Sequence, residues 1–211
     1  MQVSVNDMLK KISFEDYDNI LEYTSIIEAG IKAKWNEYLR NNAKAEDDSY
    51  LDDYREILQM FKYRMELMTI CCLSELWEQD LVTFLKKNNT PLNTDKNVTY
   101  KVLQKTFKDR FGYSLDENTT IVEMRSLVNS IKHGEGSSFQ ELKNICGDDI
   151  LADSCMCKTY NGEGEPERYK EIHFDSNTLT SKTLNVKDRI TEYHDAIIDF
   201  WNVIFKKLDE K

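Results

Sequence analysis

Three side chains suited to work on a phosphate ester recur at helical spacing between residues 125 and 133. Arg125, Asn129 and His133 lie four positions apart, so on a helix they advance only about 40° per step and form one strip about 12 Å long. An imidazole can accept and donate protons, and a guanidinium can hold a phosphate and stabilise the charge that develops on it. The set is therefore chemically sufficient for metal-free RNA cleavage, in which a base takes the 2′-hydroxyl proton and that oxygen attacks the adjacent phosphate.

The same stretch also has the features of an ordinary helix end. Lys132 and His133 are cations beside the negative end of the helix dipole, and Gly134 suits the left-handed residue that commonly follows a helix. Lys132 accordingly has two interpretations, as a phosphate or RNA contact and as a solvated terminal lysine. Glu78, on the preceding long helical segment, likewise either orients Arg125 or His133 as a carboxylate partner or remains an exposed helix glutamate.

The composition indicates the kind of fold that must position these groups. The chain has 211 residues, of which 40% are hydrophobic and 31% are charged, and it contains only 7 Gly and 2 Pro. This length favours a single domain over residues 1–211, and the scarcity of helix breakers favours long helices. We therefore predict an all-α fold, an antiparallel helical bundle with long helices.

Apolar spacing and stop signals predict where the helices lie. Helices are expected from residue 13 to about 40, from 51 to about 85, from 98 to 110, from 118 to 132 and from 187 onward. A capping box, Ser138 to Glu141, predicts the start of a further short helix. An irregular or β-hairpin excursion is expected near 155–175, with strands near 156–160 and 169–174 and a tip at 162–166.

The longest apolar pattern runs from Leu51 to Cys72 at spacings of three and four. It fits an intramolecular core and also an intermolecular coiled coil. Additional apolar residues at Ile57, Ile70 and Leu73 indicate a surface wide enough for a core and a dimer contact together. His194, on the last helix, has no partner recognisable in the sequence and is expected on a helix flank.

The net charge of −10 makes a broad grip on duplex nucleic acid unfavourable. Lys101, Lys105 and Lys108 share one helical face, which is either a local phosphate track or a solvated surface. The first residues show no basic-then-apolar signal, and no stretch approaches 18 uncharged apolar residues. We therefore expect a cytoplasmic protein with no membrane association.

The cysteines, five in number, do not resemble a disulfide framework, and a reducing compartment fits them. Cys146, Cys155, Cys157 and His173 provide four side chains that zinc accepts, although their spacing matches no tight ligand pattern. The alternative is free thiols in a small satellite core. We predict no metal or cofactor in the Arg125 to His133 site.

The segment from Glu123 to Leu142, which contains Asn129, His133 and Gly134, resembles the helix–turn segment of prokaryotic HEPN-type proteins. Two further segments look similar in the same order, 73–81 and 184–201, so that the resemblance spans roughly residues 50 to 208. It implies an all-helical bundle, usually a homodimer, that acts as a metal-independent endoribonuclease in toxin–antitoxin or antiphage systems. An antitoxin or another defence-system protein would then be a partner.

On this resemblance His133 corresponds to the family's histidine, Asn129 to its polar residue one turn earlier, and Arg125 to its arginine. The family's motif usually has four to six residues between arginine and histidine, whereas this chain has seven. Other HEPN-type domains only bind partner proteins or nucleotides. The resemblance therefore implies two functions, a ribonuclease and a non-catalytic binding and dimerisation module.

Overall fold

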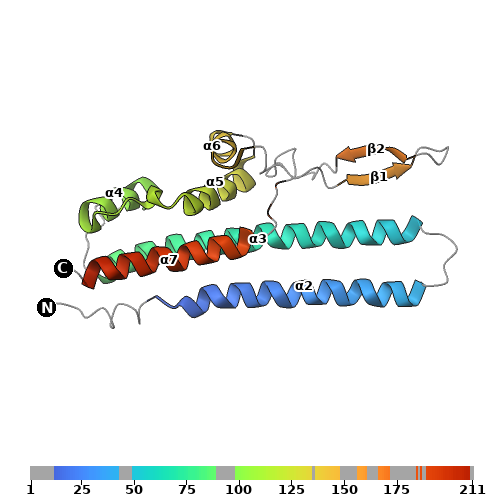
Figure 1. Ribbon diagram of the computed structural model, residues 1–211, viewed down its shortest axis with the longest axis horizontal. Helices are drawn as coiled ribbons and strands as arrows, with labels where there is room; N and C mark the ends of the chain where they lie inside the picture. Colours follow the sequence, from blue (N-terminus) through green and yellow to red (C-terminus); the bar gives the residue numbers. More distant parts are fainter. Residues whose placement is uncertain are drawn as a thin grey trace. The chain divides into compact units, whose positions relative to one another are not determined.

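The structure is a computed structural model that describes residues 12–42, 49–88, 98–134, 136–147, 156–160, 166–171, 184, 186 and 189–209 (Figure 1). Its helices, in chain order, are α2 (Phe14–Asn42), α3 (Ser49–Lys87), α4 (Tyr100–Phe111), the short 3-10 helix η1 (Leu115–Glu117), α5 (Thr119–His133), α6 (Ser137–Cys146) and α7 (Arg189–Asp209). The predicted all-α class is confirmed. None of the described helices is long and apolar enough to cross a membrane.

Within the described residues a β-hairpin lies between α6 and α7, one of the two alternatives that the sequence leaves open. Strand β1 (Met156–Tyr160) pairs antiparallel with β2 (Pro166–Glu171), and Tyr160 lies opposite Pro166. The second strand thus begins at Pro166, which the sequence places in the tip.

The chain divides into two compact units. Unit 1 draws on residues 1–21, 69–125 and 188–211, and unit 2 draws on residues 22–68 and 126–187. Helices α2, α3 and α5 each contribute residues to both units, so the units do not correspond to separate stretches of the chain. The single domain over residues 1–211 stays a prediction.

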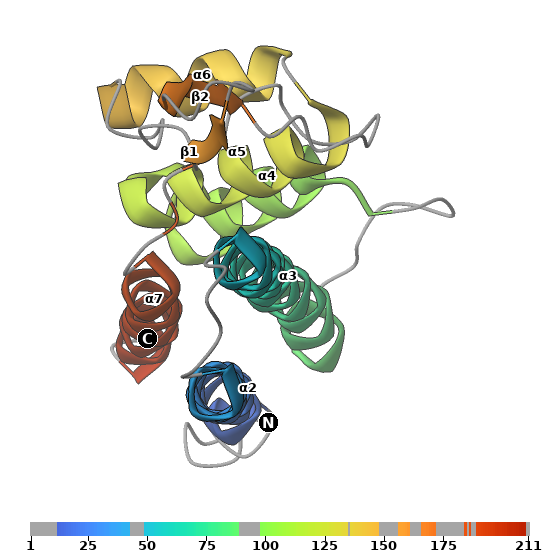
Figure 2. The same cartoon turned by 90° about the vertical axis from the view of Figure 1, so that its right-hand side faces the viewer.

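Aromatic side chains from α3, α4 and α7 form the core of unit 1. The Phe200 ring packs edge-on against Trp77 at 5.5 Å between centroids and lies 6.0 Å from Phe107. Phe84 contacts Trp201 at 5.3 Å, and all five of these side chains are at most 1% exposed. Figure 2, seen nearly along the helix axes, shows α7 next to α3. The last helix, α7, thus packs on α3 within this unit.

Polar pairs fasten the first turns of α2 to this core. The buried Tyr17 hydroxyl donates a 2.6 Å hydrogen bond to Asp80 of α3. The adjacent Asp18 contacts Nε2 of His194 at 3.0 Å, and Asp195 contacts Nδ1 of the same ring at 2.9 Å. His194 is only 8% exposed, so the expectation that it lies on a helix flank is wrong. Its partner Asp18 lies 176 positions away, beyond the reach of a local pattern.

In unit 2, α2 and α3 pair antiparallel, as the contacts between them show. Glu28 meets Lys62 at 3.3 Å, while Tyr54 meets Trp35 and Tyr38, so rising numbers on α2 match falling numbers on α3. Ile27, Ile31 and Trp35 are half-buried, as their spacing predicts.

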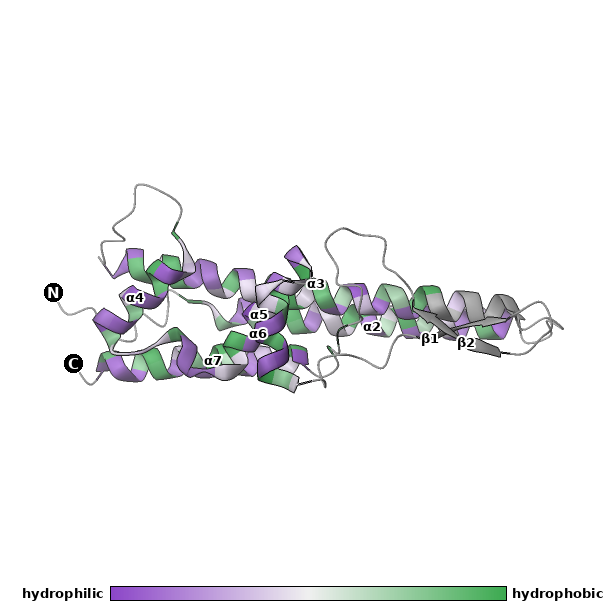
Figure 3. Cartoon of the chain, turned by 90° about the horizontal axis from the view of Figure 1, so that it is seen from above, coloured by the Kyte–Doolittle hydropathy of each residue, from purple (hydrophilic) through white to green (hydrophobic). Residues whose placement is uncertain are grey.

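Several large apolar residues of α2 and α3 face solvent instead. Tyr23 is 64% exposed, Ile57 55%, Phe61 49% and Met68 59%. Tyr54, Phe61 and Met68 are each seven positions apart, and a seven-residue repeat drifts about 20° per heptad on a straight helix. The drift turns this stripe progressively away from the buried side of α3. Figure 3 shows hydrophobic residues, in green, interspersed with hydrophilic ones along α2 and α3.

Helix α6 begins differently from the prediction. Its first residue is Ser137 and its N-cap is Gly136, with no side-chain capping bond. Glu141 does not close a capping box with Ser138, because its carboxylate accepts a 2.7 Å hydrogen bond from Ser126 of α5. This bond fastens α6 to the second half of α5 within unit 2.

The pair of buried Tyr17 and half-buried Asp80 makes a pH-dependent contribution to stability. Burial raises the pKa of Asp80 above its ordinary value of 3.8, and the hydrogen bond from Tyr17 offsets this only in part. The folded state therefore binds more protons than the unfolded state above that value, and stability falls as the pH rises through the folded pKa.

We predict that Asp80→Asn removes this loss while keeping an acceptor for Tyr17. The free energy of unfolding of the variant relative to wild type, measured by urea titration, should increase from about pH 4 upward. Asp199→Asn, at an exposed carboxylate of α7, controls for the loss of one charge. A pH-independent difference for Asp80→Asn would contradict the prediction.

Candidate functional site

Helix α5 is held by an apolar side and by defined ends. Ile121, Met124 and Leu127 are fully buried. At the first turn the Asn118 side chain accepts a hydrogen bond from the amide of Ile121. At the other end Gly134 has a φ of 75° and donates a 2.8 Å bond to the Ser130 carbonyl. The predicted helix end and its left-handed glycine are confirmed.

Arg125 lies in a fixed position within unit 1. Its Nε donates a 2.9 Å hydrogen bond to Glu78 of α3, and its guanidinium lies 3.2 Å from the centre of the Tyr100 ring at the start of α4. The side chain of Arg125 is 18% exposed, and that of Glu78 is 42% exposed. The structure thus brings together Arg125 and Glu78, two residues that the sequence selects. Within the described part of the chain, the two terminal nitrogens of Arg125 make no hydrogen bond.

Tyr100 is held in turn by its own contacts. Its hydroxyl donates a 3.2 Å bond to Asp116, which also accepts from the Gln104 amide. Burial raises the pKa of Tyr100, and the nearby Arg125 opposes that rise. A neutral phenol ring under the guanidinium favours the cation through the ring quadrupole. No local pattern in the sequence identifies Tyr100, because only the packing of α4 on α3 brings it to Arg125.

The other selected residues of α5 belong to unit 2. Asn129 is half-buried, and His133 is exposed at the last helical position. Neither side chain has a hydrogen-bond partner among the described residues. Lys132 is also exposed. An exposed imidazole at a helix end can exchange protons with a ligand, whereas Arg125 belongs to the other unit and is held there by Glu78.

A second ion-pair cluster, which the sequence does not reveal, joins α5 to α7. The Glu123 carboxylate accepts hydrogen bonds from the Arg189 guanidinium and from the Tyr193 hydroxyl, the latter at 2.7 Å. The ionic side chains are only 14–16% exposed. Glu123 precedes Arg125 by two positions, so this cluster fixes the turn of α5 that carries Arg125.

The remaining candidate sites are the lysine face of α4 and the possible zinc site. Lys101, Lys105 and Lys108 of α4 are exposed, which fits both of their interpretations. Cys155 and His173 of the possible zinc site lie outside the described residues, and Cys146 is half-buried at the end of α6. No cluster of three metal-binding side chains occurs in the described part of the chain, so zinc binding stays untested.

Comparison with protein-family models found no match, and searches of curated proteins and of solved structures also found none.

Arg125→Lys should lower the free energy of unfolding by about 1 kcal/mol, because lysine keeps the charge but loses the planar contact with Tyr100 and the Nε donor. Glu78→Gln should cost less, since the half-exposed carboxylate is screened by solvent. Urea titration measures both effects, and the double variant tests whether they are coupled. Arg40→Lys, at an exposed position of α2, is the matched control. Equal stability of Arg125→Lys and Arg40→Lys would show that the contacts of Arg125 do not stabilise the fold.

Proposed function

We propose that this chain is a HEPN-like, metal-independent endoribonuclease subunit that works as a homodimer, with Arg125 binding phosphate and His133 acting as acid and base. The observation that carries the proposal is the fixed guanidinium of Arg125. Glu78 and Tyr100 engage its Nε and one of its faces. The two terminal nitrogens keep the paired donors with which arginine binds a phosphate.

The reaction needs only proton transfer and charge stabilisation. The His133 imidazole takes the proton of a ribose 2′-hydroxyl group, and the 2′-oxygen attacks the adjacent phosphorus. The bond from phosphorus to the 5′-oxygen breaks, and that oxygen takes the proton back from the His133 imidazolium. The products are a 2′,3′-cyclic phosphate and a 5′-hydroxyl end. Arg125 stabilises the negative charge that builds up on the phosphate oxygens, and Asn129 positions the substrate.

The proposal requires two copies of the chain. Arg125 and His133 are eight residues apart on α5, about 12 Å along the helix axis. Because Glu78 holds Arg125, the arginine is not free to swing towards the histidine of its own helix. A second copy would bring its own His133 to the phosphate that Arg125 binds.

An exposed apolar face on unit 2 supports pairing with a second copy. The face consists of Tyr23 and Ile26 on α2 and of Ile57, Phe61 and Met68 on α3, which are 49–64% exposed. Five large side chains at this exposure leave on the order of 500 Å² of mainly apolar surface. Monomers rarely expose more than a few hundred Å² in one patch, and a stable dimer buries about 800 Å² per partner.

The charges next to this face are compatible with self-association. Lys34 and Glu37 form a 2.9 Å ion pair on α2, and Arg64 lies on α3 between Phe61 and Met68. In a chain with a net charge of −10, a contact flanked by charges of both signs avoids the repulsion that an acidic surface would add.

The second candidate function is a non-catalytic HEPN-like module that dimerises and binds a protein or nucleotide. The Glu78 carboxylate favours it, because its charge opposes that of Arg125 and weakens the attraction of the guanidinium for phosphate. In both cases the biological setting that we propose is toxin–antitoxin or antiphage defence, with an antitoxin or another defence protein as partner.

Purified protein incubated in EDTA with a mixture of single-stranded RNAs should produce fragments that end in 2′,3′-cyclic phosphates. His133→Ala should lower the cleavage rate by about 100-fold or more, the usual contribution of a general acid or base. The measurement is gel analysis of end-labelled RNA, with end groups identified by mass spectrometry.

Gln140→Ala on the neighbouring α6 is the control, because Gln140 is exposed and its side-chain amide donates a hydrogen bond to Asn144 of its own helix. Wild type and His133→Ala that are equally inert on all of these RNAs would leave the binding module as the function.

The exposed apolar face predicts a self-association that one added charge disrupts. Wild type should sediment as a dimer in analytical ultracentrifugation. Phe61→Glu should raise the dimer dissociation constant at least tenfold, because the carboxylate would lose water in the contact. Ser25→Glu adds the same charge at an exposed position of α2 outside the face and should leave dissociation unchanged. A wild-type monomer at all concentrations would refute the dimer.

A further inference from the structure

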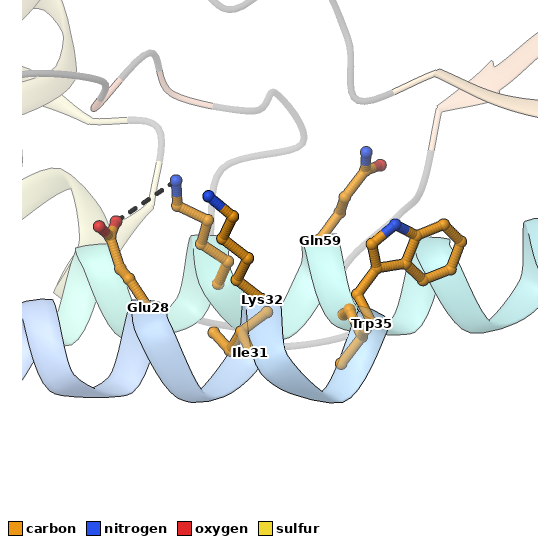
Figure 4. Close-up of a pocket in the computed structure, with 7 residues that line it drawn as sticks. Glu28, Ile31, Lys32, Trp35 and Gln59 are labelled. Carbon is orange, nitrogen blue, oxygen red and sulfur yellow. Dashed lines mark ion pairs between the residues drawn. The ribbon is translucent and has the colours of Figure 1, made fainter. Parts of the chain in front are cut away.

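A groove between α2 and α3 lies on the side of unit 2 away from the exposed apolar face. Lys32 and Trp35 border it from α2, and Gln59 and Lys62 border it from α3, around a volume of about 320 Å³ (Figure 4). On a helix, Lys32 is nine positions from Tyr23 and Gln59 is two positions from Phe61, and both spacings place residues on nearly opposite sides. The volume lies at the lower end of the range for small-molecule sites.

The groove has an apolar base and an aromatic wall of fixed orientation. Ile31 and Leu58 line the base, half-buried between the helices. Tyr38 and Tyr54 stack with their centroids 4.1 Å apart, and Trp35 lies within 14–17° of parallel to both. These neighbours set the plane of the indole, and its half-exposed ring offers a flat surface on which another planar ring can stack.

The polar rim carries both charges, with Lys32 and Lys62 positive and Glu28 negative. Lys62 pairs with Glu28 at 3.3 Å and with Glu66 at 3.5 Å. Burial acts to lower the pKa of Lys62, but the two carboxylates outweigh it and raise the pKa, so this ammonium stays charged. Lys32 is exposed, and within the described part of the chain it has no ion-pair partner. Its charge is therefore available to a ligand.

Gln59 completes the set of recognising groups. Its side chain is exposed and rises from α3 between Trp35 and the lysines (Figure 4). An amide offers both a donor and an acceptor to the edge of a heteroaromatic ring. Ring surface, amide and free cation thus converge on one small apolar depression.

We infer that this groove binds a small molecule that combines a planar aromatic ring with an anionic group. The ring stacks on Trp35 above Ile31 and Leu58, the anion pairs with Lys32, and Gln59 contacts the ring edge. Two kinds of natural ligand share this chemistry, a mononucleotide and an aromatic carboxylate. The site is independent of the proposed ribonuclease function, because none of its residues lies on α5.

Fluorescence provides a selective readout of this site. Trp77 and Trp201 are fully buried, whereas Trp35 is only half-buried. A ligand that stacks in the groove should therefore quench Trp35, and Trp35→Leu should abolish the quenching.

The probes separate the ring from the charge. Adenosine 5′-monophosphate should bind at least fivefold more tightly than adenosine, and inorganic phosphate should not quench at all. Indole-3-carboxylate tests the second ligand source, and whichever of the two anions binds more tightly identifies the natural class. Equal affinities for adenosine and its monophosphate, together with no binding of indole-3-carboxylate, would overturn the proposal.

Matched lysine variants test the position of the charge. Lys32→Met should weaken binding of the tighter anion about fivefold or more, as measured by isothermal titration calorimetry. Lys34→Met removes the same charge from the same helix but outside the groove, where Lys34 pairs with Glu37, and it should bind like wild type. Both lysines are exposed, so neither change should unfold the chain, and circular dichroism checks this. Equal affinities of the two variants would refute the assignment of Lys32.

Discussion

The aromatic packing of Trp77, Phe107 and Phe200 is the contact on which the position of Arg125 depends. Phe200 joins α7 to both α3 and α4, and Trp77 lies 6.4 Å from Tyr100, the first residue of α4. Glu78 follows Trp77 directly on α3. The packing that buries Trp77 therefore also sets where Glu78 and Tyr100 meet the guanidinium. Burial of the apolar rings stabilises this packing, and the ion pair between Arg125 and Glu78 forms in the geometry that the packing sets.

This dependence explains why Arg125 has both a structural and a chemical interpretation. If Arg125 only stabilised the fold, one ion-pair partner such as Glu78 would be sufficient. Here a ring face and a carboxylate engage the inner side of the guanidinium, while its terminal nitrogens stay available for further hydrogen bonds. Such an arrangement loses little conformational freedom when an anion arrives. It also keeps the positive charge partly compensated in the absence of an anion.

The helices and their ends could be predicted from the sequence because the signals for them are local. Apolar residues at a 3.6-residue period identify α5 and α7, and Gly112 and Gly134 mark helix ends where the backbone turns left-handed. The exposure of Phe61 and Met68 could not be predicted, because a heptad pattern does not reveal how a 39-residue helix divides its faces between two units. The pairs of Tyr17 with Asp80 and of His194 with Asp18 join positions far apart in sequence. Within the candidate site, helical spacing identified the strip of Arg125, Asn129 and His133 on α5. Glu78 was identified as a carboxylate on the preceding long helix. The ring of Tyr100 became evident only from the packing of α4.

The pairing of Asp18 with His194 has a consequence for how the chain folds. Unit 1 combines three segments that are separated by the segments of unit 2. Loop-closure entropy must be overcome before contacts so distant in sequence become favourable. During synthesis, the first turns of α2 emerge long before α7, yet Tyr17 and Asp18 find their complete surroundings only once residues 189–209 exist. Until then, the apolar sides of α3 and α4 have no aromatic partner from α7. The nascent chain thus exposes these surfaces until α7 has been synthesised, and it has the greatest need of a chaperone in that interval.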